Sequence, residues 1–519
     1  MTDLSIPAVG IDLGTTNSAI AWIDDLGRPV TLNNAEGDKL TPSVLLVEDE
    51  NIVIGKEAVK AKGTDFDLVA ECAKRELGEL VFSKTLGERQ YPPEVLQGWI
   101  LHKLRIDAIG QIGDFSQVVV TVPAYFDEVR RKSTQDAGYI AGLDVLDIIN
   151  EPTAAAIAYG VQLAQRDPER AKQPQTILVY DLGGGTFDVT VMRLNGNEYT
   201  ALATDGDVLL GGRDWDQRLV DFATESFLRQ FGMDPREDAN TAGRLWRECE
   251  DAKHTLTQRT STNIACDYMG NALRVEITRD NFEKMTRDLL DRTAFTTRQT
   301  LEQANLGWGE IDRVLLVGGS SRMPAVIAML QELTGKNLDT SISPDEAVAH
   351  GAAMHAAALI DQKDGRDPRI VVQNVNSHSL GVAGSDPNTG MSRTAVVIPR
   401  NTQLPVTARR VFKTQQDGQQ SVLVNIVEGE SHSPDDCTQI GSCTVTGLPA
   451  NLPAHTPIEV RFRYRPNGRL TVGVCVEGTD INLRHEITRE NSLNQTQLDA
   501  WRSYVTGVSI DTESVEDAP

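Results

Sequence analysis

One motif occurs twice in this chain, and each copy directly follows a short apolar run. The first copy, Asp12–Thr16 (DLGTT), follows Val9–Ile11, and the second, Asp181–Thr186 (DLGGGT), follows Ile177–Tyr180. A short apolar run that ends at a glycine turn is typical of a buried strand in an α/β protein. The repeat therefore predicts two copies of one α/β lobe within a single chain.

The chemistry of the repeated motif favours phosphate binding. Glycine lets backbone N–H groups approach phosphate oxygens closely, and a threonine hydroxyl adds a further donor. The aspartate that opens each copy can hold a water of a hydrated Mg²⁺ ion. A tight turn after a strand would explain either copy alone, but the two copies in this order favour a pair of loops that clamp a triphosphate.

The net charge limits what such a site can rely on. Fifty Lys and Arg against 74 Asp and Glu give a formal charge of −24. This field repels nucleic acid, anionic membranes and ATP itself, so a phosphate site must act through Mg²⁺ and backbone dipoles at contact distance. The N-terminal residues lack the pattern of a secretory signal, no run approaches the ~18 apolar residues of a membrane span, and the cysteines form no Cys-x-x-Cys pair. We therefore expect a cytoplasmic protein that binds neither nucleic acid nor membrane.

The pattern of apolar and polar residues along the chain changes after its first two thirds. A chain of 519 residues is too long for one core, and up to Leu359 strand-like runs alternate with helical patterns, as in an α/β domain. The polar breaker Asp364–Pro368 and the apolar run Ile370–Val372 follow, which indicates a linker. Beyond it, Pro466-Asn467-Gly468 between two alternating runs predicts a β-hairpin in an antiparallel β-sandwich. The predicted divisions are an α/β domain (1–365), a linker (366–378), a sandwich (379–490) and a short amphipathic segment with an acidic end (491–519).

Three further segments fit a nucleotide site, although each has a plainer explanation. Asn150–Thr153 (NEPT) ends a strand-like run and opens an alanine-rich helix, which places Glu151 at a crevice or simply marks a helix start. Gly318–Arg322 (GGSSR) is a glycine turn before a helix and suits a phosphate or adenosine contact. Glu250, Lys253, His254 and Thr257 share one helical face, which a solvated polar face would explain equally well. Neither a Walker P-loop nor a dinucleotide fingerprint occurs.

These segments, in this order, resemble the seventy-kilodalton heat-shock chaperone family of the DnaK type. The resemblance is close from Val9 to Ala358 and weaker in the β-rich part. The matching segments are Gly10–Ser18, Val122–Phe126, Ile149–Ala156, Asp181–Asp188, Leu316–Pro324, Pro344–Ala347, Ser379–Gly381 and Val427–Glu430.

The resemblance implies a two-lobed, actin-like ATPase domain, built as a duplicated ribonuclease H-like fold and followed by an antiparallel β-sandwich. It implies ATP hydrolysis to ADP with Mg²⁺ and assigns a catalytic role to Lys74, which would otherwise be one lysine among many. Asp12, Glu151 and Asp181 would organise Mg²⁺ through water and orient the attacking water. Thr186 and Asp188 would line the γ-phosphate and a potassium position. The implied catalytic residues are Asp12, Lys74, Glu151, Asp181 and Thr186.

The resemblance also implies where nucleotide and client bind. The clients would be unfolded or extended polypeptides, and a J-domain co-chaperone and a nucleotide-exchange factor would be partners. The implied nucleotide contacts are Gly14, Thr15, Thr16, Asn17, Gly183, Gly184, Gly185, Glu250, Lys253, His254, Thr257, Gly318, Gly319, Ser320, Arg322 and Asp345. The implied peptide channel is lined by Phe412, Val422, Val424 and Ile426, although apolar strand residues are often plain core.

Several positions depart from the family pattern. His254 stands where the family has an arginine over the adenine, and Asp147 replaces an arginine used to dock J-domain proteins. Gln373 replaces an apolar linker residue, so we expect weakened coupling between the domains. The 29 residues of 491–519 are too few for a helical lid.

Two other functions remain open on the sequence alone. A nucleotide-binding regulator or scaffold that holds one dedicated partner would fit the changed linker and Asp147, but Lys74, Glu151, Asp181 and Thr186 oppose it. A small-molecule kinase on the same fold is disfavoured by the β-rich domain. Peptide-stimulated ATP turnover separates the chaperone from the scaffold.

Overall fold

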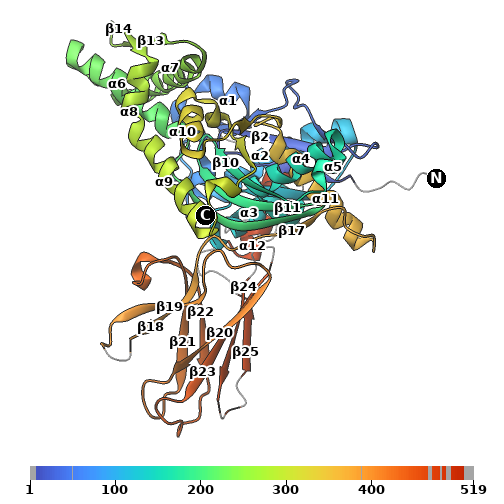
Figure 1. The fold of residues 1–519 in the computed structure, drawn as a ribbon. Helices are drawn as coiled ribbons and strands as arrows, with labels where there is room; N and C mark the ends of the chain where they lie inside the picture. The colour runs from blue at the N-terminus through green and yellow to red at the C-terminus, as the bar shows by residue number, and fades with distance from the viewer. Residues whose placement is uncertain are drawn as a thin grey trace.

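The computed structural model describes residues 7–48, 51–386, 389–465, 470–477, 479, 482–486 and 493–507. Two α/β lobes lie side by side, and a β-sandwich lies below them in the view of Figure 1. The predicted fold, a two-lobed α/β domain followed by an antiparallel sandwich, is confirmed.

The first lobe is built on a sheet with the order β3-β2-β1-β8-β9, and the short strand β4 pairs with β2. A small three-stranded sheet and helix α1 are inserted into this lobe, and a 3₁₀ turn at Ala73–Glu76 follows them. The strands are β1 (Val9–Asp12), β2 (Asn17–Ile23), β3 (Pro29–Thr31), β4 (Thr41–Pro42), β5 (Val44–Glu48), β6 (Asn51–Ile54), β7 (Val69–Glu71), β8 (Gln117–Val122) and β9 (Asp144–Asn150). The helices are α1 (Lys56–Ala61), α2 (Pro93–Ile112), α3 (Glu128–Ile140), α4 (Glu151–Arg166) and α5 (Pro168–Ala171).

The second lobe has a sheet with the order β16-β15-β10-β11-β12-β17 and an outer part made of α6, α7, α8 and the hairpin β13–β14. Its strands are β10 (Gln175–Leu182), β11 (Phe187–Asn195), β12 (Glu198–Asp207), β13 (Ser261–Tyr268), β14 (Asn271–Thr278), β15 (Arg313–Val317), β16 (Leu338–Asp339) and β17 (Val371–Gln373). Its helices are α6 (Gly212–Phe231), α7 (Ala239–Gln258), α8 (Arg279–Met285), α9 (Arg287–Gln303) and α10 (Pro324–Thr334). Helix α11 (Ala347–Lys363) follows them in the chain and packs on the sheet of the first lobe and on α4.

The two lobes repeat one strand arrangement, as the motif repeat predicts. In the first lobe β1 runs antiparallel to β2 and parallel to β8, and in the second β10 runs antiparallel to β11 and parallel to β15. The two copies of the motif therefore follow equivalent strands, β1 and β10, at equivalent ends of the two sheets. The alanine-rich helices α4 and α11 pack against each other and against both sheets. A β-carbon on Gly351 would lie 1.8 Å from the carbonyl oxygen of Ala154, so this contact requires glycine.

The sandwich consists of two four-stranded sheets, β19-β18-β21-β22 and β20-β23-β24-β25. Its strands are β18 (Leu380–Ser385), β19 (Ser392–Ile398), β20 (Val406–Lys413), β21 (Ser421–Glu428), β22 (Thr438–Thr446), β23 (Pro457–Tyr464), β24 (Leu470–Val476) and β25 (Asn482–Glu486). Strands β23 and β24 pair antiparallel, as the hairpin prediction requires. The predicted turn itself, Pro466-Asn467-Gly468, lies outside the described residues.

The sandwich is attached to the α/β lobes at both of its ends. The segment predicted as a linker forms β17, which pairs parallel with β12 and so extends the sheet of the second lobe. The segment predicted as amphipathic forms helix α12 (Gln495–Thr506), which packs on α2 and α3 of the first lobe. There Trp501 lies 6.1 Å from the ring of Tyr91, and Tyr504 lies 5.9 Å from the ring of Trp99.

Candidate nucleotide-binding and catalytic site

A pocket between the two lobes gathers most of the residues predicted to bind nucleotide. The predicted residues that line it are Asp12, Gly14, Thr15, Thr16, Asn17, Lys74, Glu151, Asp181, Gly183, Gly184, Thr186, Glu250, Lys253, His254, Thr257, Gly318, Gly319, Ser320 and Asp345.

Three predicted residues lie beside the pocket and not on its wall. Gly185 packs against Thr15, and Asp188 accepts a hydrogen bond from the backbone of Tyr125 at 3.0 Å. The guanidinium of Arg322 forms a bidentate ion pair with Asp345, with distances of 2.7 and 3.0 Å. Arg322 is therefore fixed at the rim through Asp345, which does line the pocket.

The two glycine loops touch each other across the pocket. A β-carbon on Gly184 would lie 1.9 Å from Oγ1 of Thr16, and one on Gly185 would lie 2.3 Å from Cγ2 of Thr15. Any larger residue would push the loops apart, so glycine is needed for this close approach. The loops therefore face each other as the repeat predicts.

Lys74 is buried at the base of the pocket and paired with Glu151. Its Nζ lies 2.5 Å from Oε1 of Glu151, and only 1% of Lys74 is exposed. Lys74 comes from the 3₁₀ turn after β7, and Glu151 is the first residue of α4. A buried lysine needs a partner, and Glu151 supplies it because α4 begins where β9 ends at the same crevice.

Burial and mutual repulsion raise the pKa values of the carboxylates in and beside the pocket. Burial, followed by the charge of Glu151, raises the pKa of Asp12 to about 7, although Thr121 donates to this carboxylate at 3.0 Å. The same two causes raise the pKa of Asp188 to about 7 and lift that of Asp181 well above its usual range. Four acids that surround one lysine form an anionic site suited to a divalent cation.

The carboxylates fit a hydrated Mg²⁺ ion better than a directly coordinated metal. Among the described residues, no three His, Cys, Asp or Glu side chains converge closely enough to hold a metal ion directly. Magnesium usually keeps several waters and takes few protein ligands, so Asp12, Glu151 and Asp181 suit contact through water.

The far end of the pocket is lined by helix α7 and the Gly318 turn. The predicted face of α7 points into the pocket, and Lys253 in it is buried and paired with Asp216 at 2.6 Å. Burial and the charge of Lys253 lower the pKa of His254, so its imidazole is neutral at pH 7.

The pocket also contains residues that the sequence reasoning missed. Glu71 forms ion pairs with Lys62 and with Arg213, whose guanidinium lies 4.0 Å from the ring centre of Trp246. Burial opposes ionisation of Glu71, but the charges of Arg213 and Lys62 outweigh it and lower the pKa to about 2. Trp246 lies four residues before Glu250 on α7, so extending the helical face by one turn would have found it. No comparable sequence pattern predicts that Lys62, Glu71 and Arg213 line the pocket.

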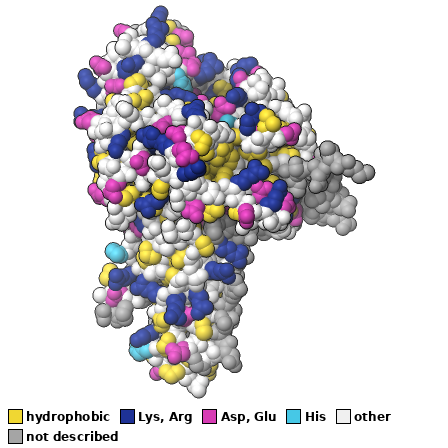
Figure 2. Space-filling model, turned by 45° about the vertical axis from the view of Figure 1, so that its right-hand side comes forward, with side chains coloured by type: hydrophobic (Ala, Val, Ile, Leu, Met, Phe, Trp, Pro, Cys, Tyr) yellow, Lys and Arg dark blue, Asp and Glu magenta, His cyan; other side chains and the backbone are white. Residues whose placement is uncertain are grey.

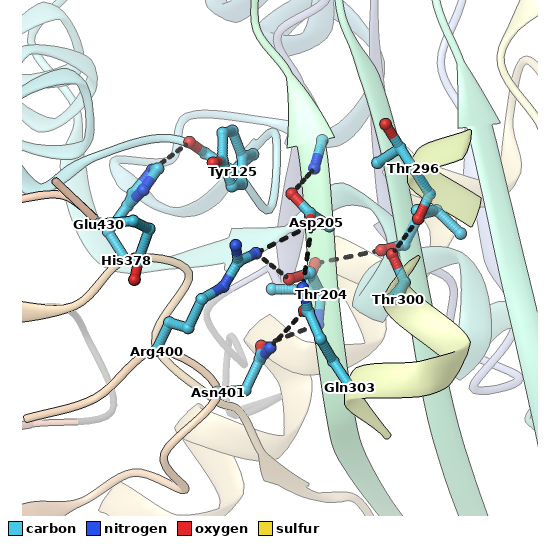
Figure 3. A network of polar contacts seen from close by, with 12 residues as sticks. Tyr125, Thr204, Asp205, Thr296, Thr300, Gln303, His378, Arg400, Asn401 and Glu430 are labelled. Atoms are coloured by element: carbon cyan, nitrogen blue, oxygen red, sulfur yellow. Dashed lines mark hydrogen bonds and ion pairs between the residues drawn. The ribbon is translucent and has the colours of Figure 1, made fainter. Parts of the chain in front are cut away.

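A polar network joins the sandwich to the second lobe (Figure 3). Arg400 pairs with Asp205 at 3.1 Å, and Asn401 accepts from the backbone of Thr204 and donates to Gln303. The neighbouring His378 bonds to the carbonyl oxygen of Tyr125 at 3.0 Å. The contacts of Arg400 and Asn401 hold a loop of the sandwich against β12, the strand that also pairs with the linker, whereas His378 contacts the first lobe at Tyr125.

The predicted peptide-channel residues lie at different depths in the sandwich. Val424 and Ile426 are buried in its core, whereas Phe412 and Val422 are partly buried and pack against that core. Their role in peptide binding stays a prediction.

The chain is similar to known proteins along almost its whole length. Residues 8–510 match the family model described as "Hsp70 protein". A protein of Halobacterium salinarum named "Chaperone protein DnaK" is 40% identical over 479 residues, which cover 91% of this chain and 73% of that relative. A protein of the same name from Thermotoga neapolitana is 37% identical over 499 residues, which cover 94% and 82% respectively. Together with the two-lobed fold and the pocket, these matches show that the chain belongs to the Hsp70 family of ATP-hydrolysing molecular chaperones.

Proposed function

We propose that the pocket holds ATP or ADP with Mg²⁺ and that Lys74, Glu151 and Thr186 act at the γ-phosphate. The buried Lys74–Glu151 pair beside the two facing glycine loops is the observation that carries this proposal. A cation held in place without water solvation can stabilise the charge that develops on a transferring phosphoryl group.

In this proposal the protein positions the reactants and does little covalent chemistry. The loops that contain Gly14–Asn17 and Gly183–Thr186 hold the phosphate oxygens through backbone N–H groups and hydroxyls. Glu151 and Asp181 accept hydrogen bonds from the attacking water and keep it in line. Bound Mg²⁺ supplies positive charge to the phosphate oxygens, and Asp12, Glu151 and Asp181 would hold it through water. Asp188 would line a potassium position.

We further propose that the sandwich binds extended apolar segments of unfolded polypeptides and that Phe412, Val422, Val424 and Ile426 line the channel. The linker strand β17 on β12 and the Arg400–Asp205 pair support coupling between nucleotide and client binding, because both attach the sandwich to the lobe that carries the second glycine loop. Weakened coupling through Gln373 stays a prediction.

The partners and the location of the protein are proposed on less direct grounds. A J-domain protein and a nucleotide-exchange factor are the proposed partners. Basic and acidic side chains are interspersed on the face shown in Figure 2, so the charge of −24 does not form one acidic patch there. Within the described ranges, no helix combines the length and the apolar character needed to cross a bilayer. A cytoplasmic location stays a prediction.

Steady-state ATPase assays with and without a panel of extended apolar peptides test the proposed function. A chaperone should hydrolyse ATP faster when peptide is bound, because peptide held by the sandwich shifts the lobes toward the arrangement that hydrolyses ATP. A protein that binds ATP but shows no peptide-dependent turnover with any peptide would fit the scaffold instead.

A further inference from the structure

Arg75 connects the two lobes directly beside the proposed catalytic lysine. It follows Lys74 in the same 3₁₀ turn of the first lobe. Its Nε donates to the carbonyl oxygen of Gly185 at 2.7 Å, within the glycine loop of the second lobe. Its guanidinium also pairs with both carboxylate oxygens of Asp214, at 2.6 and 3.4 Å.

Asp214 lies at the point where the glycine loop is anchored to helix α6. Its carboxylate accepts from the backbone N–H of Gly211 at 2.7 Å, which closes the first turn of α6. The next two N–H groups, those of Gly212 and Arg213, donate to the carbonyl oxygens of Gly183 and Gly184 at 3.0 and 2.8 Å. Arg75 therefore binds both the glycine loop and the residue that fixes this loop to α6.

Helix α6 and the glycine loop pack so closely that a displacement of one must displace the other. A β-carbon on Gly211 would lie 2.6 Å from the backbone of Gly185, so no slack exists between α6 and the loop. Within the first lobe, Lys74 is held in place by its ion pair with Glu151. Two adjacent residues of one 3₁₀ turn therefore act on opposite lobes. Lys74 supplies the cation of the pocket, and Arg75 binds the glycine loop of the second lobe.

We propose that Arg75 is a positioning residue for ATP hydrolysis, which sets the distance between Lys74 and the glycine loop Gly183–Thr186. Arg75 does not line the pocket, so it acts through the loop and through Asp214. The planar guanidinium can bind a carboxylate and a carbonyl at once, which a lysine ammonium cannot do with the same geometry. The inference rests on the proposed catalytic role of Lys74.

Single-turnover hydrolysis, with the protein in saturating excess over ATP, tests this role in the full chain, with Arg75→Ala and Arg75→Lys. We expect Arg75→Ala to lose roughly tenfold or more in rate, because misplacement by about 1 Å can cost up to 10²-fold. The dissociation constant for ATP, measured by calorimetry, should change by less than about threefold. Arg75→Lys should recover only part of the rate, and free guanidinium ion at millimolar concentration should partly restore Arg75→Ala.

Two further variants separate positioning from general stability. Arg218 lies on the same helix α6 and forms an exposed ion pair with Asp288 of α9, so Arg218→Ala should leave the rate unchanged. Asp214→Asn should slow hydrolysis in the native background but add little to Arg75→Ala, because residues of one network are not additive.

The inference fails if Arg75→Ala keeps the native single-turnover rate. It also fails if the loss of rate is matched by an equal loss of ATP affinity, or if guanidinium ion and Arg75→Lys restore nothing while the melting temperature falls. Lys74→Ala, measured alongside, distinguishes this failure from that of the proposed function. A slow Lys74→Ala with a normal Arg75→Ala overturns the inference alone, whereas a normal Lys74→Ala overturns the proposed catalytic site.

Discussion

The carboxylate of Asp147, on the edge strand β9, lies 2.8 Å from Nε2 of His355, on helix α11. Neither Oδ1 of Asp147 nor Nδ1 of His355, both buried, has a hydrogen-bond partner among the described residues. Asp147 is therefore not a free surface acid, because α11 holds it in place. A substitution at Asp147 must be matched at His355 to keep the edge of the first lobe intact.

This pair determines how the expected J-domain contact should be tested. If the surface around Asp147 docks J-domain proteins, a generic J-domain protein should stimulate ATP hydrolysis poorly, because an acid replaces a cation at the interface. The double variant Asp147→Arg/His355→Gln should gain stimulation, measured as the ratio of steady-state rates with and without the J-domain protein. Asp147→Arg alone should gain less, since the new cation would face His355.

The control for this prediction is Asp144→Arg, a charge reversal at the exposed start of the same strand. Strong stimulation of the native protein, or an equal gain in the control, would contradict a specific role for Asp147.

Removal of the proposed catalytic groups should slow the chemical step. Lys74→Ala and Thr186→Ala should each reduce single-turnover ATP hydrolysis at least tenfold, which corresponds to about 1.4 kcal/mol of lost transition-state stabilisation. Both should still bind nucleotide, because the glycine loops and the far end of the pocket, lined by α7, remain. Native single-turnover rates in both variants would remove the catalytic assignment.

A change at the far end of the pocket, where we propose that the adenosine binds, should alter nucleotide affinity without altering chemistry. His254 is neutral at pH 7, since burial and Lys253 lower its pKa. His254→Arg should therefore add a cation over the adenine and tighten ATP and ADP binding by about 0.5–2 kcal/mol. Calorimetry is the measurement, and Arg247→Ala on the same helix is a control. Equal or weaker affinity would mean that His254 does not stack on the base.

Two glutamates face each other at the junction of the domains and should make docking depend on pH. The backbone N–H of Glu128, at the start of α3, donates to Glu428 of the sandwich at 3.0 Å. Burial, followed by the charge of Asp127, raises the pKa of Glu428 to about 8, despite Arg130 and Arg131 nearby.

The same buried site raises the pKa of Glu128, first by burial and then through the charge of Glu428, and Tyr464 lies 3.5 Å from its carboxylate. Docking therefore takes up a proton. The stabilisation that this proton gives to the docked state is complete below about pH 4.5, the ordinary pKa of glutamate. It is lost as the pH rises to about 8.

Fluorescence energy transfer between one dye on each domain should show docking that weakens as the pH rises through this window. The double variant Glu128→Gln/Glu428→Gln should remove most of the dependence, and Glu459→Gln, at a partly exposed acid on β23, should leave it unchanged. Docking that strengthens with rising pH, or a dependence that survives in the double variant, would contradict the prediction.

The local chemistry of the site could be predicted from the sequence. The strands β1 and β10, the two glycine loops after them and the polar face of α7 follow from short-range patterns, because hydrophobic period and turn residues act within a few positions of the chain. The duplication of the lobes also follows, since it is written as a repeat. These patterns, together with the family resemblance, were sufficient to predict most of the residues that line the pocket.

Tertiary structure alone decided which distant residues meet. Lys74 is buried only because α4 brings Glu151 beneath it, and Arg75 acquires its partners only when the lobes close on one another. His355 becomes the partner of Asp147 because α11 crosses the edge of the sheet, 208 positions further along the chain. The linker became a strand of the second lobe because β12 offered a free edge, and no local period encodes a contact between segments so far apart.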